Sequence, residues 1–293
     1  MKSLHVLYPR GFCSGVARAV SMVRGALDGH GAPVFVYNEI VHNKSVLQEL
    51  SELGAVFVNR LEDADPLRPL VLSAHGVPKH IEMAAKERHA IVIDAACPLV
   101  KKSHEKIESF PDDYEIVIIG DREHPEIIGL RGRIEKEARY VKTVADVAGL
   151  SLPESAKVGV VSQTTLNLDD VREIVEEIRK KYGCVEVQDS ADLCEATKVR
   201  QQAVRDAAPG ADLVVVLGSK NSSNSNNLRN VAIHAGARAA VLIDSAKEFD
   251  FDLPDECNNI CVTAGASAPE SLVRDFVSAF KSKYPDCEIF GNY

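Results

Sequence analysis

Short apolar runs alternate along the chain with stretches whose apolar residues recur at helical spacing. Six of these runs have the length and composition of buried strands, and they lie at residues 33–40, 69–73, 114–120, 157–162, 212–218 and 259–265. Each run passes directly into a polar loop. Helices that alternate with buried strands are typical of parallel sheets, so the pattern predicts an α/β fold. In such sheets ligands bind at the carboxyl ends of the strands, where all six polar loops fall.

The same order of elements recurs in each third of the chain, and each third has a cysteine at the start of a helix-like stretch. These cysteines are Cys13, Cys97 and Cys194. The first polar loops follow them at 29, 27 and 28 residues, with His42, His124 and Ser222. The second loops follow at 62, 67 and 73 residues, with His75, Thr164 and Ser267.

This repetition predicts three pseudo-symmetric domains, each with a small parallel sheet. We expect them at residues 1–96, 97–193 and 194–280, followed by a C-terminal tail at 281–293. Cysteines from three such domains can meet only on a shared central axis. The fold therefore predicts one central site built from three thiols.

A thiol at a helix N-terminus lies at the positive end of the helix dipole, so its thiolate form is favoured. Three converging thiolates make a metal site that lacks a fourth protein ligand. An iron–sulfur cluster normally takes four cysteines, so with three one iron keeps an open position that can act as a Lewis acid. Zinc with three cysteines is the alternative, although the chain has no C-x-x-C pair of the kind that zinc sites usually use.

The polar loops are rich in groups that bind anions. Short hydroxyl and amide side chains at strand ends form a nest for an anionic group, and three histidines in the same loops favour a multiply charged anion such as a diphosphate. The candidates are His42, His75, His124, Thr164, Ser222, Ser223, Asn224 and Ser267. Glu126 is the one carboxyl group among them with a clear role, because an enclosed carboxyl has a raised proton affinity and can act as an acid.

Composition restricts the class of protein. The net charge of −9 argues against nucleic acid as the main partner. No apolar run approaches the ~20 residues of a membrane span, and the N-terminus lacks the apolar core of a signal peptide. Seven cysteines without regular close spacing indicate reduced thiols, so we expect a soluble cytoplasmic protein. The four other cysteines are expected in the core, at Cys184, Cys257, Cys261 and Cys287.

Eight short motifs together resemble those of the 4-hydroxy-3-methylbut-2-enyl diphosphate reductase family. They are GFCSGV, NEIVHN, SAHGV, DAACPLV, EHPE, SQTT, GSKNSSNSN and TAGASAP. The resemblance runs from about residue 5 to about residue 280. Each motif alone is weak, but the combination is highly specific.

The resemblance implies a three-domain cloverleaf around a [4Fe–4S] cluster, with Cys13, Cys97 and Cys194 as its ligands. It implies that the diphosphate is held by His42, His75, Ser222, Ser223, Asn224 and Ser267. His124 and Thr164 would lie near the substrate hydroxyl and the proton path, with Glu126 as the proton donor. The reaction implied is reductive dehydroxylation of the allylic diphosphate to isopentenyl and dimethylallyl diphosphate. The chain has no nucleotide-binding motif, so a ferredoxin or flavodoxin is the implied electron donor.

Two residues depart from the family pattern. Ala96 precedes Cys97 where threonine is common, and Asp121 stands where a further histidine is often seen. Both departures affect how the site is tuned rather than its chemistry. Two other functions remain alternatives: an iron–sulfur hydro-lyase without net electron transfer, and a non-catalytic iron–sulfur sensor or electron carrier. The anion-binding loops disfavour the second.

Overall fold

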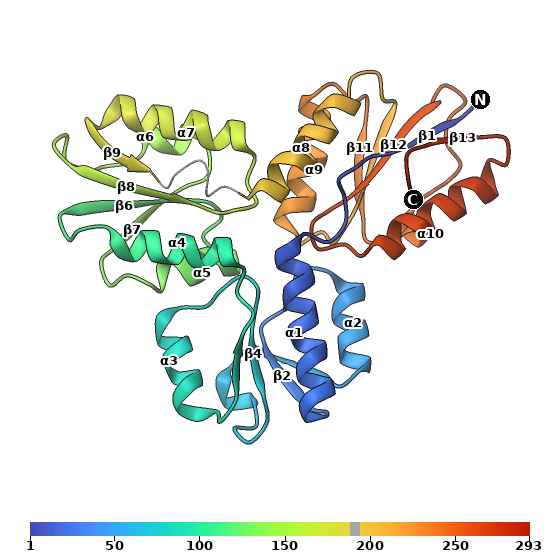
Figure 1. The fold of residues 1–293 in the computed structure, drawn as a ribbon. Coiled ribbons are helices and arrows are strands. Elements are labelled where there is room, and N and C mark those ends of the chain that lie inside the picture. The colour runs from blue at the N-terminus through green and yellow to red at the C-terminus, as the bar shows by residue number, and fades with distance from the viewer. Residues whose placement is uncertain (188–193) are drawn as a thin grey trace. The chain divides into compact units, whose positions relative to one another are not determined.

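The computed structural model describes residues 1–187 and 194–293 (Figure 1). The described strands form three sheets, and every pairing within them is parallel. The chain divides into two compact units. One contains residues 1–17, 42–48 and 195–293, and the other contains residues 18–41 and 49–194. None of the described helices is both long and apolar enough to span a membrane.

The first unit is built on a five-stranded sheet. Its strands lie in the order β11 (Ala240–Ile243), β10 (Leu213–Leu217), β12 (Asn259–Ala264), β1 (Ser3–Val6) and β13 (Glu288–Phe290). Successive side chains of a strand point to opposite faces of the sheet. Because helices cover both faces, the side chains on both faces are apolar.

Three helices cover this sheet: α8 (Glu195–Ala207), α9 (Ser223–His234) and α10 (Glu270–Lys283). Val214 and Val216 of β10 belong to the buried cluster that includes residues of α8 and α9. Val215 and Leu217 belong to the cluster that includes residues of α10. The strand is thus buried on both sides, which explains its continuous apolar run.

The second unit contains two four-stranded sheets. The first has the order β3 (Ala55–Val58), β2 (Val34–Tyr37), β4 (Leu70–Leu72) and β5 (Val92–Asp94). Its part of the chain also forms helices α1 (Ser14–His30), α2 (Lys44–Glu52) and α3 (Lys79–Arg88) and the short 3-10 helix η1 (Leu61–Asp63). The first residues of α1 and α2 belong to the other unit.

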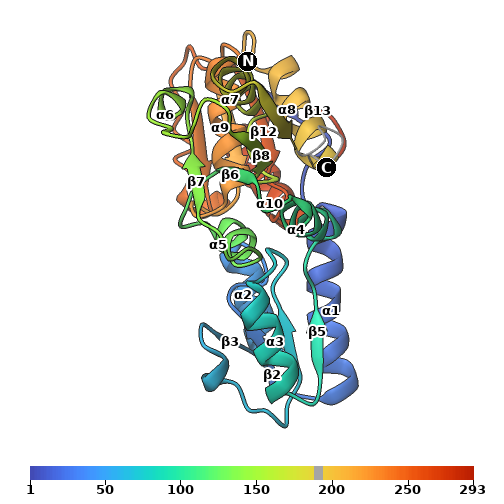
Figure 2. The ribbon, with the colours of Figure 1, turned by 90° about the vertical axis from the view of Figure 1, so that its left-hand side faces the viewer.

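The other sheet of this unit has the order β7 (Ala138–Val141), β6 (Tyr114–Ile119), β8 (Lys157–Ser162) and β9 (Cys184–Val187). Helices α4 (Pro98–Ser109) and α5 (Pro125–Arg131) cover one face, and α6 (Val144–Ala148) and α7 (Leu168–Lys181) cover the other (Figure 1, Figure 2). The carboxyl ends of β6 and β8 lead into α5 and α7, so polar residues at these ends meet at one edge of the sheet.

The predicted α/β class with three small parallel sheets is confirmed. The strand membership differs from the expected boundaries at both ends of the chain. β1, expected in a first domain at 1–96, pairs with β12, and β13, expected in a tail at 281–293, pairs with β1. The order of elements along a chain does not reveal which strands pair, so this crossover could not be predicted. The division at residues 97 and 194 stays a prediction.

Candidate active site

Two of the three predicted ligand cysteines have backbone contacts that fix them at the start of a helix. Cys13 directly precedes α1, its N–H donates to Ala266 O (3.1 Å), and its Sγ accepts from Val16 N (3.4 Å). Cys97 is the N-cap of α4, and its N–H donates to Ala74 O (2.9 Å). The Cys13 sulfur therefore accepts one helix N–H group, a contact that favours a thiolate.

Cys194 directly precedes α8, so all three cysteines occupy the predicted position. All three are partly buried, and none forms a disulfide. Cys13 belongs to the first unit, whereas Cys97 and Cys194 belong to the second. Within each unit, the described residues contain no group of three histidine, cysteine or carboxyl side chains arranged to hold a metal ion.

The other cysteines have different surroundings. Cys257 and Cys261 are buried, as expected, and burial raises the pKa of the Cys261 thiol to about 11. Cys287 is partly buried. The expectation is wrong for Cys184, which is exposed because it opens β9, the edge strand of its sheet.

Two arginines hold the backbone next to two of the predicted ligand cysteines. Arg18 on α1 donates from Nη1 to Ala96 O (3.0 Å), beside Cys97. Arg200 on α8 is 5% exposed and donates from Nη2 to Gly11 O (2.7 Å), two residues before Cys13. Sequence reasoning missed both residues, because an arginine in an amphipathic helix usually faces solvent.

In the first unit, the loops after β10 and β12 bring four predicted anion-binding residues together. Ser222 caps α9 by accepting from Ser225 N. Asn224 Oδ1 accepts from Ala266 N (2.8 Å), and Ser267 Oγ donates to His42 O (2.9 Å). Ser222, Asn224 and Ser267 are buried although they are polar. Ser223 is the first residue of α9 and is partly buried.

The amide nitrogen of Asn224 is a buried hydrogen-bond donor among these anion-binding candidates. Its Nδ2 is buried and has no hydrogen-bond partner among the described residues. A buried amide donor left without an acceptor costs about 1–3 kcal/mol. An anionic oxygen at this place would satisfy it, so the nest fits a ligand of the predicted charge.

His42, the fifth candidate of the first unit, contacts Ser267 through its backbone O. The second unit brings together the other four candidates, His75, His124, Thr164 and Glu126. The rings of His75 and His124 meet edge to face, with 5.8 Å between their centroids. His124 is the N-cap of α5, and its Nδ1 accepts from Glu126 N (3.2 Å). Glu126 is 2% exposed and lies in the first turn of that helix.

Thr164 donates two hydrogen bonds to the Glu126 carboxyl group. Thr164 N donates to Oε1 (2.7 Å), and Thr164 Oγ1 donates to Oε2 (3.1 Å). These bonds lower the pKa of the carboxyl group, but burial raises it more, to about 7. A carboxyl group with this pKa holds a proton at neutral pH and can also release it, as a general acid must.

Removing the Thr164 hydroxyl is expected to raise the pKa of Glu126 further. Thr164→Val keeps the backbone N–H but removes one of the two donors that stabilise the carboxylate. The loss of activity at high pH should move upward by about 0.5 to 1 pH unit. The measurement is the pH dependence of kcat, with Thr165→Val as the control. An unshifted profile would contradict the coupling.

Asp121 lies in the loop that precedes α5, and its backbone O accepts from His124 N (2.9 Å). Its carboxylate pairs with Lys142 (2.8 Å), which lowers the pKa of Asp121. Asp121→His would remove this negative charge and leave Lys142 unpaired, so diphosphate should bind about two- to fivefold more tightly. Calorimetric titration with the diphosphate tests this, and an unchanged affinity would show that Asp121 does not tune the site.

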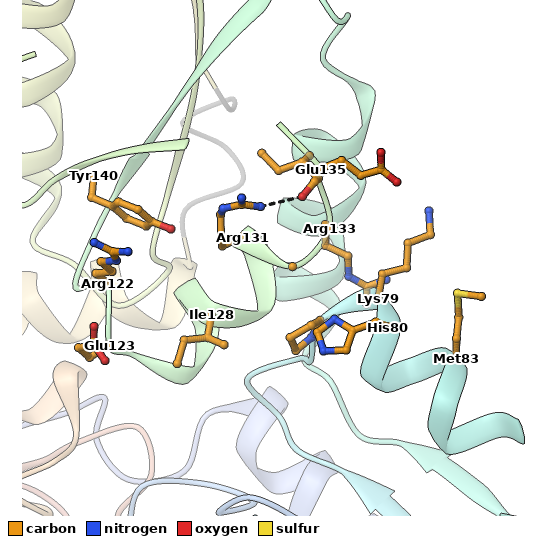
Figure 3. A pocket seen from close by; sticks show the side chains of 13 residues that line it. Lys79, His80, Met83, Arg122, Glu123, Ile128, Arg131, Arg133, Glu135 and Tyr140 are labelled. Carbon is orange, nitrogen blue, oxygen red and sulfur yellow. Dashed lines mark hydrogen bonds between the residues drawn. The ribbon is translucent and has the colours of Figure 1, made fainter. Parts of the chain in front are cut away.

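A pocket of about 860 Å³ lies on the exposed side of α5, between α3 and β7 (Figure 3). Its lining mixes cations such as Arg122 and Arg131 with Glu123, Glu135 and exposed apolar side chains. Arg131 Nη1 donates a hydrogen bond to Ile134 O (2.7 Å), drawn as the dashed line at Arg131 in Figure 3. None of the predicted site residues lines this pocket, so the candidate chemistry lies elsewhere.

Comparison with known proteins adds independent information. Residues 4–281 match the family described as LytB protein. A relative from Phenylobacterium zucineum, named 4-hydroxy-3-methylbut-2-enyl diphosphate reductase, is 46% identical over 278 residues, which cover 94% of this chain and 88% of the relative. A relative of the same name from Ruegeria pomeroyi is 43% identical over 284 residues, 96% of this chain and 90% of the relative.

Solved structures agree with these matches. The structure of the E-1-hydroxy-2-methyl-but-2-enyl-4-diphosphate reductase from Plasmodium falciparum is 34% identical, with a TM-score of 0.92, over 100% of this chain and 93% of that one. A second structure, of (E)-4-hydroxy-3-methyl-but-2-enyl diphosphate reductase, the terminal enzyme of the non-mevalonate pathway, is 29% identical. Its TM-score is 0.67, over 96% of this chain and 100% of that one.

Proposed function

The chain belongs to the LytB protein family, and on this premise we propose that it is the terminal reductase of the non-mevalonate isoprenoid pathway. Its substrate is (E)-4-hydroxy-3-methylbut-2-enyl diphosphate, and its products are isopentenyl and dimethylallyl diphosphate. Two electrons and two protons are consumed, and the allylic hydroxyl leaves as water. The observation that carries the proposal is the buried carboxyl group of Glu126, which holds a proton near neutral pH beside two paired histidines.

A [4Fe–4S] cluster is the cofactor of this proposal, held by Cys13, Cys97 and Cys194. The residues fit such a group, because each thiol directly precedes a helix and none is used in a disulfide. When bound, the cluster supplies electrons one at a time and Lewis acidity at the iron that no cysteine holds. A ferredoxin or flavodoxin in the cytoplasm supplies the electrons.

The protein's own residues bind and orient the diphosphate. Ser222, Ser223, Asn224 and Ser267 supply short donors, and α9 adds the positive end of its dipole. His42 and His75 add ring N–H donors. Asn224 Nδ2 supports this role most directly, since it is a buried donor that awaits an acceptor. Binding of the diphosphate orients the substrate.

Glu126 delivers a proton to the leaving oxygen as negative charge develops there. Its burial raises the pKa to about 7, so a large share of the carboxyl groups carry a proton at neutral pH, and Thr164 stabilises the carboxylate that remains. His124 accepts the Glu126 N–H through Nδ1, which leaves its Nε2 as the donor when the ring is neutral. His124 can therefore orient the substrate hydroxyl toward the carboxyl group.

The test is anaerobic purification with iron and sulfide analysis, followed by an assay with the allylic diphosphate. Dithionite with a mediator serves as the reductant. We expect a brown protein, bound iron and sulfide, and product formation that requires the reductant. Turnover without a reductant would instead indicate a hydro-lyase, and a colourless zinc protein would refute the cluster.

A further inference from the structure

Three neighbouring strands of the five-stranded sheet end in residues that hold the segment His42–Lys44. β10 lies between β11 and β12, with Leu217 opposite Ile243 and Ala264. Asp244 follows β11, Ser219 follows β10 and Ser267 follows β12. Because these strands are parallel, all three residues lie at the carboxyl end of the sheet.

These residues contact the segment on both sides of Asn43. Ser267 Oγ donates to His42 O (2.9 Å), and Ser219 Oγ accepts from Lys44 N (3.1 Å). Asp244 Oδ2 accepts from Lys44 Nζ (2.8 Å). Ser219 is 2% exposed and the Asp244 side chain is 13% exposed, so water competes little at these two acceptors, whereas the Lys44 side chain is 73% exposed and its ion pair with Asp244 is open to solvent on that side.

The segment is also ordered from within. Asn43 is buried, and its Oδ1 accepts from Val46 N (3.2 Å) and from Ser45 Oγ (2.8 Å). This is the pattern of an N-cap, so α2 starts at Lys44, the last residue of the held segment. Loss of a contact at the strand ends should therefore displace His42, because the segment around it is held by hydrogen bonds of its own.

The hydroxyl of Ser267 has only one proton to donate. In the structure His42 O accepts that proton, whereas the oxygens of a diphosphate can only accept. For Ser267 to bind the diphosphate, its hydroxyl must therefore turn away from His42 O. The contacts from Ser219 and Asp244 then remain to hold the segment.

We propose that Ser219 and Asp244 are positioning residues. They keep His42 in place for diphosphate binding when the Ser267 hydroxyl leaves His42 O and donates to the diphosphate instead. The proposal rests on the proposed function. It assigns a role to two residues outside the predicted site and predicts that their loss weakens substrate binding without slowing the chemical step.

Asp244→Asn is the decisive variant, because its electrostatic and positioning effects have opposite signs. Removing a negative charge next to Lys44 should by itself favour an anion and lower KM. Loss of the ion pair that holds the segment should raise KM. We expect KM to rise about three- to tenfold, with kcat changed less than about twofold. Asp252→Asn, which breaks the Lys283 ion pair elsewhere in the same unit, is the control.

Lys44→Gln breaks the same ion pair from its exposed side, where folding is least at risk. A rise in KM in both variants supports positioning, whereas a rise for Lys44→Gln and a fall for Asp244→Asn would show that Lys44 acts as a simple attractive charge. That outcome would overturn the proposal.

A double-mutant cycle tests whether Ser219 acts through His42. Ser219→Ala alone should raise KM about three- to tenfold, but in a His42→Ala background it should add little. Multiplicative effects, or an unchanged KM, would refute the role. Ser282→Ala is the control, since Ser282 Oγ likewise bonds to the backbone, donating to Ser278 O (2.9 Å) away from the held segment. All rates are measured with dithionite and mediator. Absence of turnover in the unmodified protein would refute the proposed function instead.

Discussion

Glu126→Gln is expected to slow turnover by about 10²–10⁴-fold while the protein still binds its substrate and its cluster. Glutamine matches the shape of the carboxyl group and can still accept from Thr164 N, but it has no acidic proton to give. Folding should not suffer. At pH 8 the native carboxylate is buried at a cost, as its pKa near 7 shows, and glutamine carries no such charge.

Three measurements distinguish loss of the acid from loss of the site. They are kcat with dithionite and mediator, the affinity for the allylic diphosphate, and the iron content per chain. Glu123→Gln is the matched control, because Glu123 is an exposed carboxyl group in the same loop. If Glu126→Gln turned over as fast as the unmodified protein, Glu126 would not be the proton donor.

The pH dependence of the unmodified enzyme provides a second reading. The acid form of Glu126 is present below its pKa of about 7 and is lost as the pH rises through that value. Activity should therefore fall on the alkaline side of neutrality. The residual activity of Glu126→Gln should lack this fall.

Cys97→Ala is expected to abolish the cluster, its brown colour and all reductive turnover. Cys97 stands at the N-cap of α4 with Pro98 as the first helical residue, so the helix start persists without the thiol. Two remaining thiolates hold a four-iron cluster poorly. The same result is expected for Cys13→Ala and Cys194→Ala.

Iron, acid-labile sulfide and the visible absorption spectrum report on the cluster without reference to activity. Cys184→Ala and Cys257→Ala serve as controls, one exposed and one buried, and both should keep the full iron content. A Cys97→Ala protein with normal iron and sulfide would show that this thiol is not a ligand.

The strands that the sequence predicted are those with a neighbour on both sides. β2, β4, β6, β8, β10 and β12 are all interior, and their continuous apolar runs reflect burial on both faces. The edge strand β9 is half-exposed and reads CVEV, a mixed pattern that the sequence analysis did not identify as a strand. The edge strand β11 reads AVLI and is apolar throughout, but its four residues are too few to stand out. β1 is interior but reads SLHV, which is too short and too mixed to stand out.

The candidate site was predictable where chemistry demands a residue type. Glu126 and Thr164 are 38 positions apart, yet both follow neighbouring parallel strands, so their hydrogen bonds agree with the repeat. The residues that orient the site were not predictable in this way. Arg200 and Ser219 bond to backbone atoms of Gly11 and Lys44. Every residue offers such backbone atoms, so the partner's residue type gives no sign of the contact.

The pairing of β1 has a consequence for how the protein is made. The N-terminal strand hydrogen-bonds only to β12 and β13 among the described strands, and both are synthesised more than 250 residues later. Cys13 receives its contact with Ala266 O only once that part of the chain exists. The second unit is complete on the ribosome well before this moment. The first thiol made is therefore among the last to be set in place, and under the proposed function all three thiols are ready for a cluster only after residue 266 has been made.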